Sequence, residues 1–311
     1  MKTLWVLEGP TAVGKTALAI AWAKQLGTWI VSADSRQVYR ELRIGVARPE
    51  PEELAAVPHR LIAHRSIHAY YSVSHFETEA LREIEDGFKT HDDLVLTGGS
   101  GLYVQAVCEG MDELPDADPA LRAQLIELYE KQGLEGLRQA LRLADPTFYR
   151  QADLCNPVRL RRALEVCYLT GQPYSSFRRK AAAKRPFAIR RYALNRPREE
   201  LYDRINRRVD LMIAEGLEEE ARDLYAYKDL PALQTVGYRE WFAHFDGLMD
   251  RETAIEHIKM NSRRYAKRQI TWLKHQTPCR WLSPADGDAL PTDNDASPSD
   301  GRPPLAIQPN E

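Results

Sequence analysis

A segment near the start of the chain has the residue types needed to bind phosphate. Residues 9–16 read Gly-Pro-Thr-Ala-Val-Gly-Lys-Thr, which fits the pattern G-x-x-x-x-G-K-[ST] of a phosphate-binding loop. In such a loop the glycines let successive backbone N–H groups face an anion, the lysine adds a positive charge, and the last hydroxyl can ligate Mg²⁺. The pattern predicts a diphosphate site made of Gly9, Pro10, Thr11, Ala12, Val13, Gly14, Lys15 and Thr16, with Thr16 as the Mg²⁺ ligand.

A carboxylate follows the second apolar run of the sequence. Asp34 comes directly after residues 29–33, Trp-Ile-Val-Ser-Ala, and ligands of parallel sheets bind at the carboxyl ends of strands. A nucleotide hydrolase would also need an acid after a later strand, but the run 94–97 continues into Gly98, Gly99 and Ser100. Asp34 is therefore suited to the acceptor of a transferred group. It could equally cap the next turn.

These groups need strands and helices in alternation to bring them together. Apolar runs at 3–7, 29–33 and 94–97 predict buried strands, while 16–26 and 76–88 have the composition or apolar spacing of helices. Strands that alternate with helices form parallel sheets. We therefore expect an α/β fold, a parallel sheet flanked by helices like that of the P-loop NTPases.

The pattern changes after Gly110, where capping residues stand ahead of prolines. Asp118-Pro119 and Asn156-Pro157 predict helix starts, so an all-helical domain is inserted into the sheet. The expected divisions are 1–110 for the first part of the core, 111–190 for the insertion, 191–282 for the rest of the core with helices at 198–215 and 252–273, and 283–311 for a disordered tail.

Basic residues are concentrated although the whole chain carries a formal charge of −2. Residues 159–208 contain fifteen basic and four acidic side chains, and residues 258–280 contain seven basic and no acidic ones. Such blocks attract polyanions, although solvated helix faces would also explain them. The four cysteines lack the C-x-x-C spacing of zinc sites. Without a signal peptide or a long apolar run, we expect a cytoplasmic protein with no membrane partner.

Around Asp34 the sequence resembles the tRNA dimethylallyltransferase family, also called tRNA isopentenyltransferases. The resemblance spans roughly residues 3–282. It rests on the strings GPTAVGKT (9–16), DSRQVY (34–39), GGSGLY (98–103), RALEV (162–166), GYRE (237–240) and YAKRQ (265–269).

Membership implies transfer of a dimethylallyl group from dimethylallyl diphosphate to N6 of an adenine in tRNA, with Mg²⁺ and release of diphosphate. The acceptor would be the adenine next to the anticodon, position 37 of the tRNA, in tRNAs that read codons beginning with U. Lys15, Thr16 and Arg208 would stabilise the leaving diphosphate, and Asp34 would accept the amine proton. Arg208 could instead be a solvated helix charge, and Ser100, which could bond near the acceptor, a simple turn hydroxyl.

The resemblance also implies an RNA-binding surface for the anticodon stem-loop, whose adenine would be flipped out of its stack. We expect the protein to act as a monomer. The expected RNA contacts come from three parts of the chain: Asp34, Ser35, Arg36, Gln37 and Ser100; Val158, Arg159, Leu160, Arg161 and Arg162; and Gly237, Tyr238, Arg239, Lys267, Arg268 and Gln269.

The sequence departs from the family pattern at some positions and is compatible with other functions. Val46 and Arg48 stand where the family has Thr and Lys, so the role of that loop is open. Prenylation of free adenine nucleotides would need neither the insertion nor the basic block. A phosphate-loop kinase would consume ATP instead of dimethylallyl diphosphate, and an RNA-binding protein without catalysis would not need Asp34.

Overall fold

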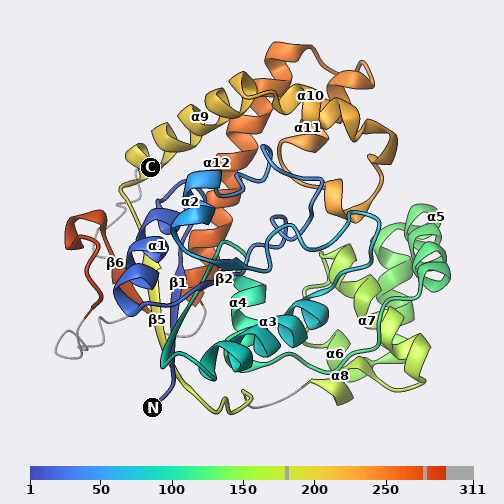
Figure 1. The fold of residues 1–311 in the computed structure, drawn as a ribbon. Coiled ribbons are helices and arrows are strands. Elements are labelled where there is room, and N and C mark those ends of the chain that lie inside the picture. Colours follow the sequence, from blue (N-terminus) through green and yellow to red (C-terminus); the bar gives the residue numbers. More distant parts are fainter. Residues whose placement is uncertain (179–181, 276–278, 292–311) are drawn as a thin grey trace. The chain divides into compact units, whose positions relative to one another are not determined.

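The computed structural model describes residues 1–178, 182–275 and 279–291 and is drawn in Figure 1. They form two compact units. One contains Met1–Glu109 and the chain from Lys184 onward, and the other contains Gly110–Ala183. The predicted insertion, 111–190, starts at nearly the same residue as the second unit but extends too far. Residues 188–194 pair with the sheet of the first unit, so they belong to that unit.

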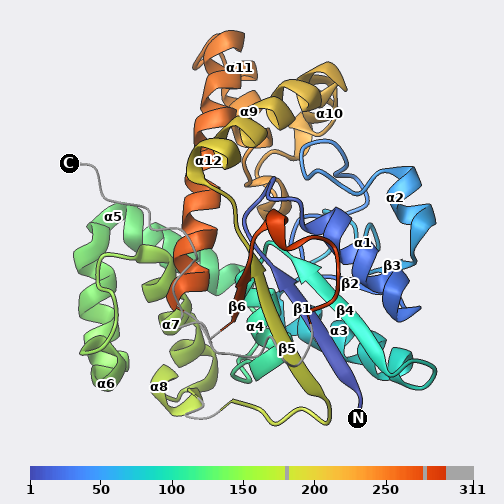
Figure 2. The same ribbon diagram turned by 90° about the vertical axis from the view of Figure 1, so that its left-hand side faces the viewer.

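The first unit is built on a sheet of six strands in the order β3-β2-β4-β1-β5-β6, and all of its pairs are parallel (Figure 2). Strand β1 is central and pairs with β4 and β5, so its last residue, Glu8, lies beside Gly98 and Ala193. The strands are β1 (Thr3–Glu8), β2 (Ile30–Ser32), β3 (His59–Arg60), β4 (Asp93–Gly98), β5 (Ala188–Leu194) and β6 (Arg280–Leu282).

Helices cover both faces of the sheet. Side chains alternate along β1: Leu4 and Val6 pack with α3 (Val73–Phe88) and α4 (Gly101–Glu109) on one face. Trp5 and Leu7 pack on the other face with α1 (Lys15–Leu26), α9 (Arg198–Ala214) and α12 (Arg251–His275). The predicted α/β fold, a parallel sheet flanked by helices, is confirmed.

A third apolar cluster joins α9 and α12 to the segment between β2 and α3. It buries Leu42, Leu217 and Trp241. The remaining elements of this unit are α2 (Pro51–Ala56), α10 (Leu217–Asp223), α11 (Tyr238–Phe245) and the short 3-10 helices Tyr225–Tyr227, Pro231–Leu233 and Pro284–Asp286. Within the described parts of the chain, no helix is both long and apolar enough to cross a membrane.

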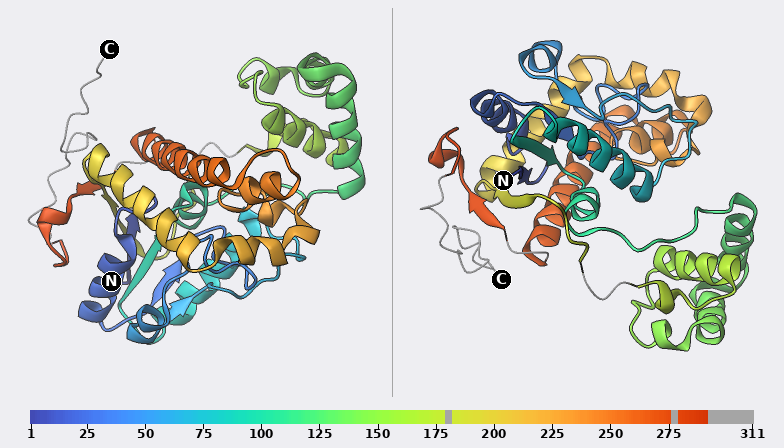
Figure 3. Two further views of the ribbon diagram at one scale, coloured as in Figure 1. Left: turned by 90° about the horizontal axis from the view of Figure 1, so that it is seen from above. Right: turned by 60° about the horizontal axis from the view of Figure 1, so that its bottom comes forward.

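In its described residues, 110–178 and 182–183, the second unit contains helices and no strand; it is the group of green helices in Figure 3. Its capping residues act as the sequence predicts: the Asp118 carboxylate accepts from the N–H of Leu121 (2.7 Å), and the Asn156 amide oxygen accepts from the N–H of Arg159 (3.1 Å). The helices are α5 (Pro119–Ala144), α6 (Pro146–Tyr149), α7 (Pro157–Thr170) and α8 (Tyr174–Phe177).

The expected tail is structured at its beginning. The side chain of Gln25 on α1 donates to the carbonyl of Asp288 (2.9 Å) and accepts from the N–H of Leu290 (3.3 Å). The expected disorder is therefore wrong at 283–291, because Asp288 and Leu290 are bonded to α1 and Pro284–Asp286 form a short 3-10 helix. Residues 292–311 lie outside the described residues.

Strand β5 is absent from the sequence expectations because two charges interrupt its apolar pattern. Arg191 is only 6% exposed and pairs with Glu8 and with Glu109, each at 2.8 Å. Burial raises the pKa of Glu8, and the carboxylates together raise the pKa of Arg191. This buried pair joins β5 to the end of β1, directly before the phosphate loop.

Replacing Arg191 should therefore destabilise the protein severely. In Arg191→Met two carboxylates lose their buried partner, which costs about 3–5 kcal/mol in the free energy of unfolding, measured by urea denaturation. The matched control is Arg198→Met at the start of α9, where an exposed arginine over the Tyr202 ring (5.1 Å) is lost at a cost of about 1 kcal/mol. Equal losses in the two variants would contradict the importance of the pair.

Candidate active site

The phosphate loop leaves β1 through backbone that only glycine adopts easily. Gly9 has φ +152° and Gly14, just before α1, has φ +108°. A Cβ on Gly9 would lie 2.6 Å from the carbonyl oxygen of Leu194, so the loop runs against β5. Ala12 also has a positive φ, 64°, a conformation that neighbouring contacts must hold in a residue with a Cβ.

Two arginines hold the loop by its carbonyl groups. The Nε–H of Arg204 donates to the carbonyl of Ala12 (2.8 Å), and the Nε–H of Arg196 donates to the carbonyl of Val13 (2.7 Å). The C=O and N–H of a trans peptide point in opposite directions. With the Val13 carbonyl bound to Arg196, the N–H of Gly14 therefore points away from the bonded Nε of that arginine.

Lys15 lies in the loop and has a lowered pKa. Its Nζ donates to the carbonyl of Pro10 (2.8 Å). Burial, with the nearby Arg208 guanidinium adding to it, lowers the pKa of Lys15 to about 8, while Asp34 and Glu8 act in the opposite direction. The neighbouring arginine makes the site positive, and an anion that enters it would favour the ammonium form of Lys15.

Arg208 of α9 reaches the same loop. Its Nη1 is 3.4 Å from the hydroxyl oxygen of Thr11, and burial, together with Arg204, lowers its pKa from the usual arginine value. A guanidinium remains charged at neutral pH despite such a shift. The alternative of a solvated helix charge is therefore wrong, because this side chain is inside the site.

The capping interpretation of Asp34 is confirmed for one of its two carboxylate oxygens. Oδ1 accepts from the N–H groups of Arg36 (2.9 Å) and Gln37 (3.3 Å), so it caps the turn. Oδ2 faces Gly99, where a Cβ would come within 3.8 Å. Asp34 therefore lies between the capped turn and the glycine-rich turn after β4.

A side chain from α12 joins the two glycine-containing turns. The amide oxygen of Gln269 accepts from the N–H of Thr11 (2.9 Å), and its NH₂ donates to the carbonyl of Gly99 (2.8 Å). A Cβ on Gly99 would lie 2.5 Å from this NH₂ group. Gln269 is 9% exposed, so its amide serves the loop geometry rather than being directed outward to an RNA.

These groups share one cavity of about 750 Å³. It brings together the phosphate loop, the turn after β2, Arg208 of α9 and residues of the α11 and α12 region. Of the residues singled out from the sequence, its lining includes Thr11, Ala12, Gly14, Lys15, Thr16, Asp34, Ser35, Arg36, Gln37, Arg208, Gly237, Arg239, Arg268 and Gln269.

Several expected contacts lie elsewhere. The Ser100 hydroxyl accepts from the N–H of Ser35 (2.8 Å) and donates to the Ser35 hydroxyl (3.0 Å), so it holds the turn beside Asp34 and does not line the cavity. Tyr238 is fully buried and its hydroxyl donates to Glu220 (2.5 Å). Leu160 is fully buried inside the second unit. The side chains of Tyr238 and Leu160 therefore cannot contact an RNA.

The other expected RNA contacts are divided between the two units. Lys267 lines a second cavity, of about 590 Å³, with Trp272 and other residues of α12. Arg36 and Gln37 have side-chain bonds within the protein, Arg36 to the carbonyls of Pro231 and Ala232 and Gln37 to that of Ala47. Val158, Arg159, Arg161 and Arg162 are in α7 of the second unit, where Val158 and Arg159 are exposed.

Mg²⁺ would fit this site only if phosphate oxygens of a bound ligand completed its coordination. Among the described residues, no group of three or more His, Cys, Asp or Glu side chains is close enough to hold a metal. Thr16 is among the residues that line the cavity. Mg²⁺ commonly binds through one or two protein groups, with phosphate and water filling its other positions, and the residues present suit that mode.

The fold and the site define a phosphate-loop protein of the α/β class with a basic cavity at the carboxyl ends of the strands. The sequence model of the family described as IPP transferase matches residues 37–276. The chain belongs to the IPP transferase family.

Named relatives support this membership over most of the chain. A tRNA dimethylallyltransferase 1 of Bacteroides fragilis is 49% identical over 283 residues, which cover 91% of this chain and 94% of that protein. A tRNA dimethylallyltransferase of Cytophaga hutchinsonii is 49% identical and covers 92% and 94%. The family expected from the sequence is therefore confirmed.

Solved structures resemble the chain as well. The full-length tRNA isopentenylpyrophosphate transferase of Bacillus halodurans has a TM-score of 0.67 at 37% identity, covering 91% of this chain and 90% of that one. A eukaryotic dimethylallyltransferase described as acting on tRNA has a TM-score of 0.77 at 26% identity, covering 91% and 74%.

The pKa of Lys15 gives a test of the phosphate site by itself. A bound diphosphate favours the ammonium form, so above pH 8 binding must take up a proton and the Kd should rise by up to about tenfold per pH unit. Calorimetric titration between pH 7 and 9.5 measures this slope. Lys15→Met is the control, because it keeps the ionisation of diphosphate itself, and an identical slope in both proteins would contradict the role of Lys15.

Proposed function

We propose that this protein transfers the dimethylallyl group of dimethylallyl diphosphate to N6 of the adenine at position 37 of tRNA, next to the anticodon, in tRNAs that read codons beginning with U. The products are N6-(dimethylallyl)adenosine and diphosphate. The observation that carries the proposal is that a diphosphate loop and the carboxylate of Asp34 line the same cavity. Family membership supplies the reaction that uses both.

The donor side of the site favours departure of the diphosphate. When the allylic C–O bond breaks, negative charge builds on the diphosphate and positive charge on the prenyl carbons. Fixed donors already in place lower this barrier because they need no reorganisation. We assign this role to the N–H groups of residues 12–16, to Lys15 and to Arg208. Mg²⁺, held through Thr16, would neutralise further charge on the same oxygens.

The acceptor side involves the adenine amine and Asp34. As the C–N bond forms, the nitrogen becomes positive and must lose a proton. We assign Oδ2 of Asp34 as the acceptor of that proton, because Oδ1 is occupied by the N–H groups of Arg36 and Gln37. A nearby carboxylate in a fixed position is suited to this general-base role.

The rest of the RNA requires a cationic surface. Arg239, Lys267 and Arg268 in the first unit, and Arg159, Arg161 and Arg162 in the second, are the proposed contacts to the backbone of the anticodon stem-loop. One chain contains both the phosphate loop and Asp34, so a monomer has the complete site. We place the reaction in the cytoplasm, with tRNA as the macromolecular partner.

The reaction is tested with purified protein, Mg²⁺, labelled dimethylallyl diphosphate and unmodified tRNA, with ATP and AMP present as competing substrates. We expect label on one adenine of the anticodon loop, and about 100-fold or greater loss of kcat in Asp34→Asn, since a general base contributes about 10²–10⁴-fold. Asp92→Asn is the matched control, because Asp92 precedes β4 and so lies at the opposite end of the sheet. Consumption of ATP without prenyl transfer, or label on free adenine nucleotides only, would contradict the proposal.

A further inference from the structure

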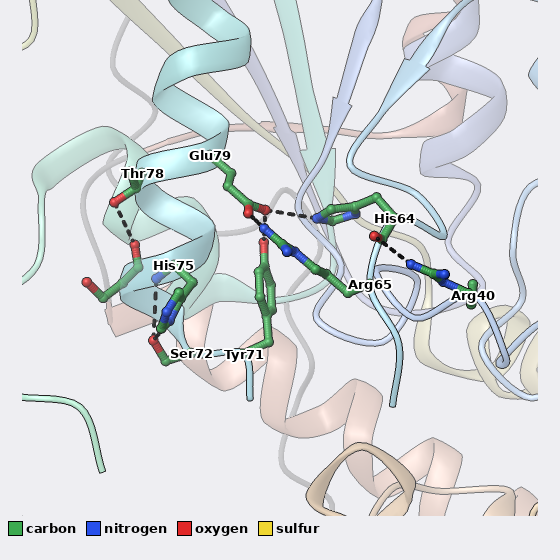
Figure 4. Close-up of polar contacts among 9 residues, drawn as sticks. Arg40, His64, Arg65, Tyr71, Ser72, His75, Thr78 and Glu79 are labelled. Atoms are coloured by element: carbon green, nitrogen blue, oxygen red, sulfur yellow. Dashed lines mark hydrogen bonds and ion pairs between the residues drawn. The ribbon is translucent and has the colours of Figure 1, made fainter. Parts of the chain in front are cut away.

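Glu79 of α3 collects donors from a loop that the proposed chemistry does not use. Its carboxylate accepts from the Nε2 of His64 (2.9 Å) and from the hydroxyl of Tyr71 (2.8 Å), and it forms an ion pair with Arg65. Figure 4 shows these side chains converging on Glu79. We call these four residues, Glu79, His64, Arg65 and Tyr71, the Glu79 cluster; none of them lines the large cavity.

The cluster is closely packed and has a defined protonation state. The His64 ring meets the Tyr71 ring edge to face at 5.8 Å, and the Arg65 guanidinium lies 5.5 Å from the centre of the Tyr71 ring. Burial and the adjacent Arg65 charge lower the pKa of His64 to about 4. A neutral imidazole has one N–H, and the 2.9 Å contact assigns it to Nε2, directed at Glu79.

The loop held by the cluster is bonded through its backbone to the turn that follows Asp34. The N–H of Ala63 donates to the carbonyl of Gln37 (2.8 Å), and the N–H of Arg65 donates to the carbonyl of Val38 (2.9 Å). In return the N–H of Arg40 donates to the carbonyl of Arg65 (2.8 Å). Gln37, the first residue of this ladder, also donates its own N–H to Oδ1 of Asp34.

The same loop has a conformation that it would not keep without support. Leu61 and Ala63 have φ values of 62° and 52°, in the left-handed region that costs a residue with a Cβ about 1 kcal/mol or more. Ile62 between them lines the cavity. A strained loop persists where surrounding contacts over-determine it, and three donors gathered on one carboxylate provide such contacts.

We propose that Glu79 is a positioning residue for Asp34, which it holds in place through His64, Arg65 and Tyr71, the backbone ladder between residues 63–65 and 37–40, and the N–H of Gln37. The inference rests on the proposed function. The proposal predicts that loss of the Glu79 carboxylate displaces the general base, Asp34, while the phosphate loop between β1 and α1 stays intact.

The test compares Glu79→Gln with Glu83→Gln in the full-length protein. Glu83 lies one turn further along α3 and pairs with Arg60 (3.7 Å) outside the cluster, so it is a matched control. A displacement of about 1 Å can lower a rate by about 10²-fold. We expect Glu79→Gln to lower kcat about 10- to 100-fold with KM for dimethylallyl diphosphate within about twofold, and Glu83→Gln to retain wild-type kinetics.

A milder variant and a second measurement separate positioning from general support of the fold. Tyr71→Phe removes one donor and should lower kcat less than Glu79→Gln does. Hydrogen exchange should accelerate at the amides of Ala63, Arg65 and Arg40 in Glu79→Gln but not at Gly14 or Lys15. An unchanged kcat would overturn the proposal, as would unchanged exchange at these amides or a loss of diphosphate binding as large as the loss of kcat.

The two proposals fail in different ways. If the wild-type protein transfers no prenyl group, the proposed function is wrong. Amide exchange in the 37–40 and 63–65 segments would still decide whether Glu79 orders the turn after Asp34. If the wild-type protein is active and Glu79→Gln is equally active, the function stands and the positioning role is wrong.

Discussion

Backbone N–H groups can gather around an anion only where the carbonyl groups of the same peptides point the other way. The carbonyls of Ala12 and Val13 are held by Arg204 and Arg196, and the N–H of Thr11 is held by Gln269. Each of these partners comes from the chain beyond residue 195, far from the loop in sequence. The phosphate site therefore depends on the packing of α9 and α12 against the first third of the chain.

The same packing places donor and acceptor chemistry side by side. Gln269 bonds both the phosphate loop and Gly99, and Gly99 faces Oδ2 of Asp34. The phosphate loop and the proposed base are thus connected through one amide side chain and one glycine, Gly99. Any bulk at Gly99 would have to displace Gln269. Behind this region, the buried pair of Glu8 and Arg191 joins β1 to β5, so charge as well as apolar packing fixes the loop.

The sequence predicts a structural feature well where the residues that determine it are contiguous. It predicts less well a feature whose residues are far apart in the chain and meet only in the fold. The phosphate loop, the parallel sheet and the start of α7 follow from short patterns such as the Asn156 cap. Strand β5 does not, because Arg191 looks like a surface charge until its two carboxylate partners are known. Arg196 and Arg204 belong to the basic block, yet their bonds to loop carbonyls leave no local signal. Leu160 and Tyr238 fall among residues expected to contact RNA, but their side chains are needed in the apolar cores.

The central claim, that diphosphate departs from the loop while Asp34 receives a proton from an adenine amine, is tested most directly by a structure of a ternary complex. It would contain an unreactive thio analogue of dimethylallyl diphosphate and an unmodified anticodon stem-loop. Our account predicts the diphosphate on the N–H groups of residues 12–16 and the adenine N6 within hydrogen-bonding distance of Oδ2 of Asp34. An adenine bound outside the cavity, or a diphosphate bound away from Lys15, would contradict it.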